Sequence, residues 1–101
     1  MHSKEDFLVY CCRICGFDYD AIGTDPEEFP WGEYGKTPSF DICVCCGHEL
    51  GFHDDIRACG KPIQTYRLKW IQEGMTFYLP QYKPVCWNPE EQLENIPEEF
   101  R

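Results

Sequence analysis

Two copies of the pattern Cys-x-x-Cys-Gly constrain this chain more than any other feature of its sequence. The first copy occupies residues 12–16 and the second occupies residues 43–47. Two thiolates three positions apart can bind one metal ion when the backbone turns tightly between them, and the glycine that follows permits a positive φ. Two such turns that face each other complete a tetrahedral site of four sulfurs. The predicted metal ligands are the outer cysteines of the two turns: Cys12, Cys15, Cys43 and Cys46.

The rest of the chain favours metal binding over disulfides. The first residues are polar, with no apolar segment typical of a secretory signal, and no run approaches the roughly 18 apolar residues of a membrane span. We therefore expect a cytoplasmic location, where thiols stay reduced, and no membrane partner. A chain of 101 residues has room for one domain with a small core, and such cores are often stabilised by a metal.

Zinc is the predicted metal, and iron is the alternative, because both accept a tetrahedron of four thiolates. Four sulfur ligands fill the coordination shell, whereas a catalytic zinc ion keeps one position open for water or substrate. The sequence also contains no phosphate-binding loop, no nucleophile elbow and no His-Glu-x-x-His pattern. We therefore expect a structural metal and no enzymatic activity.

The other cysteines leave alternatives open. Cys11 and Cys45 lie beside or inside the two turns, so ligand sets of poorer spacing that include them are conceivable. Cys59 and Cys86 are isolated in the sequence and are expected to be thiols in the core or on the surface. A second metal site formed by these four cysteines is a further alternative.

Short apolar, β-prone runs predict strands at residues 7–10, 39–42 and 75–79. Residues 18–38 contain three prolines and three glycines, which predicts an irregular loop.

The strongest helix signal covers residues 62–73, with Pro62 in the first turn and Gly74 just past the end. Arg67 is expected on the polar side of this helix. A second, short helix is predicted to begin at Asn88 as N-cap and Pro89 as first residue, and to end before Pro97. The apolar face of the first helix is formed by Ile63, Tyr66, Trp70 and Ile71.

Residues 12–20 resemble the first metal-binding turn of rubredoxins, and the second turn fits the same layout, so this resemblance covers residues 10–51. As a whole, the chain is similar to the small bacterial cysteine-rich proteins of the CPCC family. The matching features are Tyr10 before the first turn, residues 39–43 leading into the second, and Asp54 and Asp55 after it.

Where that family has proline, this chain has Arg13 in the first turn and Val44 in the second. The resemblance implies a small α+β fold with a rubredoxin-like zinc ribbon, and it implies no defined activity. We expect one domain over residues 1–101, with the ribbon at about 7–56 and a helical extension at about 57–101.

The charge limits the possible partners. The net charge is −9, from 18 acidic and 9 basic residues, and four thiolates around Zn²⁺ would add about two more negative charges. Such a chain repels nucleic acids and suits a basic protein, although the charge could serve solubility alone. Aromatic residues beside acidic ones could form a binding surface or could simply fill the core. The predicted partner-binding residues are Trp31, Tyr34, Asp54, Asp55, Trp87, Glu90 and Glu91.

Together these features predict a non-enzymatic, zinc-stabilised, acidic protein-binding module, either a monomer or a small oligomer. Its most concrete form is a bacterial immunity protein that neutralises a basic toxin such as a nuclease. Two alternatives remain open: a rubredoxin-like electron carrier with iron in the site, and a nucleic-acid-binding zinc ribbon.

Overall fold

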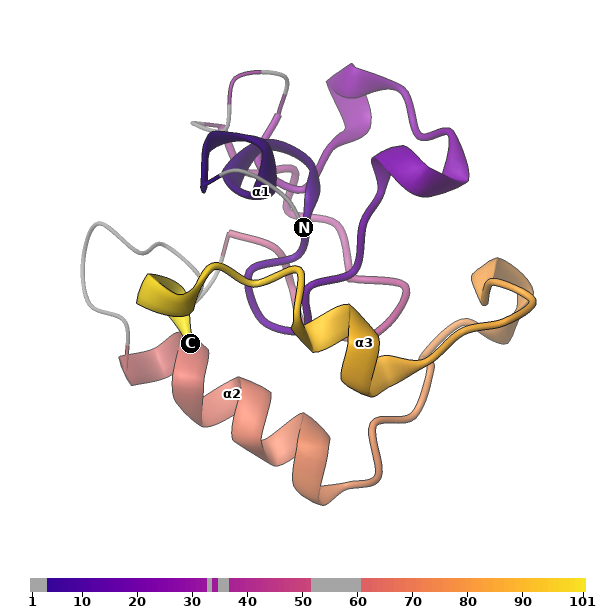
Figure 1. Cartoon of the computed structure of the whole chain (residues 1–101). Coiled ribbons are helices and arrows are strands. Elements are labelled where there is room, and N and C mark those ends of the chain that lie inside the picture. Colours follow the sequence, from indigo (N-terminus) through magenta and orange to yellow (C-terminus); the bar gives the residue numbers. More distant parts are fainter. Residues whose placement is uncertain (1–3, 33, 35–36, 52–60) are drawn as a thin grey trace.

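The computed structural model describes residues 4–32, 34, 37–51 and 61–101 (Figure 1). These residues form three α-helices, α1 (Lys4–Tyr10), α2 (Lys61–Gln72) and α3 (Pro89–Leu93). Four short 3-10 turns accompany them, η1 (Asp20–Ile22), η2 (Pro26–Glu28), η3 (Pro80–Tyr82) and η4 (Glu98–Phe100). Figure 1 shows the carboxyl terminus beside the first turns of α2, where the Gln64 side chain donates to the Arg101 carbonyl at 2.9 Å.

The prediction of a strand at residues 7–10 is wrong, because this segment forms most of α1. Phe7 is fully buried, and its ring stacks on Phe100 with 6.0 Å between the ring centroids. The N–H of Cys11 donates to the Phe7 carbonyl at 3.1 Å, and both side chains pack with Ile96. The β-propensity of four residues is a weak preference, and packing on the chain terminus outweighs it.

The strands expected at residues 39–42 and 75–79 are also absent from the described residues. Near the first segment, only an isolated antiparallel bridge between Ile42 and Glu49 forms. Phe40 interrupts the segment with a φ of 62°, and Met75 begins the other with a φ of 53°. A left-handed residue turns the chain out of the extended conformation that a strand requires. The rubredoxin-like ribbon therefore stays a prediction, as does the division of the single domain near residue 57.

Helix α2 confirms the strongest helix signal in the sequence. It ends where expected, since Gly74 follows it with a φ of 100° and donates to the Ile71 carbonyl at 3.1 Å. Ile63 and Trp70 on its apolar face are buried in the main core. The expectation for Arg67 is wrong, because its side chain is buried.

Helix α3 begins as predicted, with Asn88 as its N-cap. The Asn88 side-chain oxygen accepts hydrogen bonds from the backbone N–H groups of Glu90 and Glu91, at 3.0 and 3.2 Å. These bonds satisfy two donors that lack a partner within the helix. In the described part of the chain, no helix has the length and apolar character needed to cross a membrane.

The main core lies around the cysteine turns. It joins buried residues from both halves of the chain, including Phe17 and Phe77, whose rings meet edge to face at 5.5 Å. Trp87 extends this contact, with its ring 5.2 Å from that of Phe77. The first cysteine turn and the buried part of the second therefore lie inside the hydrophobic core, where their backbone polar groups need partners.

Candidate metal centre

We refer to residues 12–16 as the first knuckle and residues 43–47 as the second knuckle. Each is closed by a hydrogen bond from its glycine N–H to the carbonyl of its first cysteine, at 2.8 Å for Gly16 to Cys12 and 2.9 Å for Gly47 to Cys43. The two glycines have nearly equal positive φ angles, 81° and 78°. The repeated sequence pattern therefore produces the same local turn twice.

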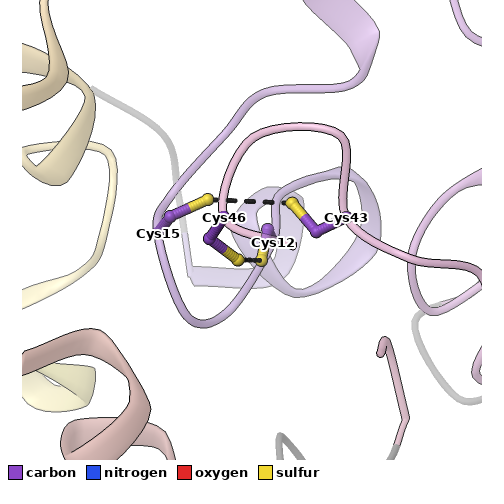
Figure 2. Close-up of side chains that lie close together, drawn as sticks. All are labelled: Cys12, Cys15, Cys43 and Cys46. Atoms are coloured by element: carbon purple, nitrogen blue, oxygen red, sulfur yellow. Dashed lines mark hydrogen bonds between the residues drawn. The ribbon is translucent and has the colours of Figure 1, made fainter. Parts of the chain in front are cut away.

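The two knuckles bring the predicted ligands together. The sulfurs of all four cysteines lie within 4.8 Å of one another. Figure 2 shows the four side chains converging, with Cys12 beside Cys46 and Cys15 beside Cys43. The Sγ–Sγ distance is 3.8 Å in each of these pairs. A disulfide bond is about 2.05 Å long, so these sulfurs are separate thiols.

The donor set fits a tetrahedral metal ion. When four sulfurs each lie about 2.3 Å from a zinc ion, the tetrahedron places them about 3.8 Å apart. The two cross-knuckle distances have this value, and the remaining ones are at most 4.8 Å. Cys12, Cys15, Cys43 and Cys46 could thus hold a metal with little rearrangement. Sulfur ligands in this geometry suit zinc and iron equally, so the identity of the metal stays a prediction.

Burial makes it costly to charge all four sulfurs at once. Burial raises the pKa of the Cys12 and Cys15 thiols, and for Cys46 the hydrogen bond with Cys12 raises the pKa first, with burial adding to it. Burial also acts to raise the pKa of Cys43, but hydrogen bonds from the other three sulfurs bring it well below its ordinary value. Four thiolates at this spacing need a positive ion to offset their mutual repulsion.

The first knuckle is held by one side chain from α2. Arg67 donates from Nε to the Ile14 carbonyl at 2.7 Å and from Nη2 to the Arg13 carbonyl at 2.9 Å. Both carbonyls are buried with the knuckle, and a buried carbonyl without a donor is costly. One arginine therefore fixes two successive peptide groups beside the metal ligands.

Helix α3 and the residues after it complete this support. The Gln92 amide donates to the Cys15 carbonyl at 3.0 Å and to the sulfur of Cys45 at 3.3 Å, and it accepts from the Trp87 indole N–H at 2.7 Å. The Asn95 amide donates to the Gly16 carbonyl at 3.0 Å. Four consecutive carbonyls of the first knuckle thus accept side-chain hydrogen bonds from the carboxyl-terminal half of the chain.

The second knuckle is held mainly by backbone groups. The N–H groups of Tyr78 and Leu79 donate to the carbonyls of Cys45 and Val44, at 2.9 and 2.8 Å. In addition, the Val44 N–H donates to the Tyr19 hydroxyl at 3.0 Å. This knuckle is also less covered, because Cys46 and Gly47 are partly exposed while the whole first knuckle is buried.

Two arginine side chains are buried at the first knuckle, and one of them, Arg67, interacts electrostatically with its cysteines. Burial lowers the pKa of Arg67, and the nearby Cys12 and Cys15 act to raise it. Arg13 has its guanidinium carbon 3.9 Å from the centre of the Trp31 ring, and it donates to the Leu8 carbonyl at 3.2 Å. The positive charge of Arg67 would offset part of the negative charge of a metal-loaded four-sulfur site.

Of the described cysteines outside the proposed ligand set, Cys45 lies against the four-sulfur cluster, because its thiol forms a hydrogen bond with Cys15. Cys11 packs with Phe7 and Ile96 in a smaller core cluster. Cys45 is fully buried and accepts from Gln92, and Cys86 is exposed. Cys59 lies outside the described residues.

The structure describes five of the seven predicted partner-binding residues. The Trp31 ring is only 2% exposed, so its expected place on the surface is wrong. Trp87 is half-buried between Phe77 and Gln92, and Tyr34 is exposed. Glu90 and Glu91 are exposed at the start of α3, and residues 54 and 55 lie outside the described residues.

No sequence pattern indicates that Arg67, Gln92 and Asn95 support the first knuckle. Each is separated from the carbonyl it binds by more than 50 positions, namely 53 for Arg67 to Ile14, 77 for Gln92 and 79 for Asn95. Helical periodicity indicates which face of a helix is apolar, but it does not reveal that a polar side chain will be buried.

The fold and the cluster define a small cysteine-rich protein with a candidate four-sulfur metal centre. Two uncharacterized proteins of Bacillus subtilis (strain 168) are similar to it. YoaQ is 33% identical over 106 aligned positions, which cover 91% of this chain and 71% of YoaQ. YozI is 35% identical over 104 positions, which cover 92% of this chain and 71% of YozI. The chain belongs to the family of YoaQ and YozI. No family model and no solved structure matches it.

Proposed function

We propose that this chain is a zinc-stabilised protein-binding module without chemistry of its own, with a rubredoxin-like zinc ribbon of the kind found in the CPCC family. The observation that carries the proposal is the cluster of four sulfurs within 4.8 Å of one another. A zinc ion bound by all four would have no open position for water or substrate. Its role would be to stabilise the fold, and the protein would act through binding by its surface residues.

The surface favours a basic protein partner. The net charge of −9 would attract a positively charged surface and speed its encounter. Several aromatic rings are more than half exposed, namely Tyr34, Phe40 and Tyr78, and rings of this kind often contribute most of the energy at interfaces. The most concrete form of the proposal is an immunity protein in the bacterial cytoplasm that neutralises a basic toxin.

Metal analysis tests the first half of the proposal. Native mass spectrometry of the purified chain should show one zinc ion, and a strong chelator should remove it and lower the thermal midpoint. The zinc-loaded protein should be colourless, whereas iron in a four-sulfur site would colour it red. A chain that carries no metal and keeps its thermal midpoint in chelator would refute the metal-stabilised module.

Affinity capture tests the second half. The tagged, metal-loaded chain, expressed in its native host, should recover a basic protein in a stoichiometric complex that weakens as salt is raised. Recovery of no stoichiometric partner would refute the binding function while leaving the metal site intact. A gel shift at low salt should show no nucleic-acid binding, because like charges repel.

A further inference from the structure

An apolar groove lies on the second-knuckle side of the molecule. Three segments line it: residues 19–28 with η1 and η2, residues 39–50 leading into and out of the second knuckle, and residues 79–82 with η3. Figure 1 shows η1 and η2 in purple and η3 in orange at the same edge of the molecule. The volume of the groove is about 360 Å³. This is at the small end of the range of about 300–1,000 Å³ for ligand sites, which suits a few side chains of a partner.

The lining includes large apolar side chains that folding leaves in water. Ile42 is 44% exposed and Tyr82 is 49% exposed, and Ile22 borders them. Phe40 lies between two lining residues, is itself exposed and holds a φ of 62°, a conformation that costs a bulky residue energy. Apolar side chains grouped in this way commonly mark a contact site.

The charges around the groove have one sign. Glu28 and Asp41 belong to the lining, and no described lining residue is basic. Residues 18–28 carry five acidic side chains and no basic one. Lys83 follows η3, but its ammonium group lies over the Trp87 ring, 5.4 Å from its centre. A positively charged segment would therefore meet an apolar floor and a negative rim.

We infer that this groove binds a basic segment of a partner protein, which inserts one to three large apolar side chains between flanking lysines and arginines. The inference rests on the proposed function and names its contact surface. The rim charges would attract the flanking residues, and burial of the partner's apolar side chains against Ile22, Ile42 and Tyr82 would supply affinity. A second copy of this chain fits less well, because two chains of charge −9 repel each other.

Peptide titration tests the groove directly. The probes are capped nonapeptides with a central triad of leucine, isoleucine, phenylalanine or tryptophan between two Lys-Arg-Lys arms. They are added to the ¹⁵N-labelled, metal-loaded full chain, and amide shifts are followed by NMR. We expect shifts at Ile22, Ile42 and Leu79, and Kd values at least 10-fold lower than for a peptide with the same arms and a Gly-Ser-Gly centre. Equal binding of the Gly-Ser-Gly peptide, or shifts that map elsewhere, would overturn the inference.

Matched variants separate the groove from the rest of the surface. The double variant Ile42→Ser with Tyr82→Ala should raise the Kd at least 10-fold. The control double variant, Leu68→Ala with Val85→Ala, removes two exposed apolar side chains that do not line the groove and should leave the Kd unchanged. Glu28→Gln with Asp41→Asn should raise the Kd a few-fold and weaken its salt dependence. Equal effects of the two apolar double variants on the Kd would contradict the inference. It would also be contradicted if the unmodified free chain were a dimer and the Ile42→Ser/Tyr82→Ala variant were a monomer.

Capture from the native host distinguishes failure of this inference from failure of the proposed function. If the unmodified chain recovers a basic partner and the Ile42→Ser/Tyr82→Ala variant does not, the groove is supported. If both recover the partner equally, the inference fails and the proposed function stands. If the unmodified chain recovers no partner, the proposed function fails, and with it the groove as its contact surface.

Discussion

The two knuckles share one sequence pattern and one backbone turn, yet the rest of the chain supports them in different ways. Side chains of Arg67, Gln92 and Asn95 hold the carbonyls of the first knuckle, which is buried throughout. Main-chain N–H groups hold two carbonyls of the second knuckle, which is partly exposed and borders the apolar groove through Val44. The first knuckle therefore lies on the buried side of the metal centre, and the second lies on the side that faces the protein surface.

This difference determines which mutations the metal centre should tolerate. A side-chain donor is lost when its residue is replaced, whereas a main-chain donor persists through most substitutions. The first knuckle should thus be sensitive to changes in α2 and α3, far away in the sequence. The second knuckle should tolerate changes in residues 78 and 79, which supply its donors.

The largest effect is expected from ligand removal. Cys15→Ser and Cys46→Ser should each abolish stoichiometric metal binding and lower the free energy of unfolding by several kcal/mol, because a structural zinc site contributes roughly 10–16 kcal/mol of binding energy. Cys15→Ser should be the more damaging, since Cys15 is fully buried and Cys46 can be hydrated. Metal content and thermal unfolding measure both effects. The exposed Cys86→Ser is the control, and a comparable loss there would contradict the ligand set.

A smaller effect is expected from Arg67→Met, which keeps the length of the side chain but leaves the Arg13 and Ile14 carbonyls without a donor. Hydrogen bonds to charged groups contribute about 1.5–3 kcal/mol each, so we expect a loss of about 3 kcal/mol in urea unfolding of the metal-loaded chain. Tyr78→Ala is the matching change at the second knuckle. It preserves the backbone bond to Cys45 and should cost about 1 kcal/mol or less. Equal losses would remove the distinction between the knuckles.

Gln92→Leu should destabilise the metal-loaded chain by about 2 kcal/mol. It keeps the approximate volume but removes the donor to the Cys15 carbonyl and the acceptor of the Trp87 indole, leaving two polar groups unsatisfied. Urea unfolding gives the loss. Glu90→Gln, an exposed change in the same helix, should stay within about 0.5 kcal/mol. If the two variants unfold alike, Gln92 does not support the knuckle.

The smallest difference is expected between the two glycines. Alanine at either position is strained by the positive φ, at a cost of about 1–2 kcal/mol. At Gly16 the new Cβ would also lie 2.7 Å from the Gln92 backbone carbonyl oxygen, whereas at Gly47 it would lie 3.0 Å from the exposed Tyr78 ring, which can move. Gly16→Ala should therefore be about 1–2 kcal/mol less stable than Gly47→Ala in urea unfolding. The reverse order would contradict the tighter support of the first knuckle.

Predictions that rest on the turn, capping and helical-periodicity signals agree with the structure where it describes them, whereas those that rest on β-propensity alone do not. The spacing of each cysteine pair, with its glycine, is enough to form a knuckle, because the turn closes over five residues. Asn88 caps α3 through bonds to N–H groups two and three positions away. The apolar periodicity of α2 likewise places Ile63 and Trp70 in the core.

The sequence by itself thus determined the knuckles, the two later helices and the charge of the chain, since each depends on neighbouring residues or on composition. Only the tertiary structure decided that residues 7–10 are helical, that Trp31 and Arg67 are buried, and how each knuckle is supported. Those outcomes depend on contacts between segments that are far apart in the sequence. One example is the hydrogen bond from Arg67 to the Ile14 carbonyl, which joins residues 53 positions apart. Burying backbone carbonyls requires donors, and no local pattern specifies which remote side chain will supply them.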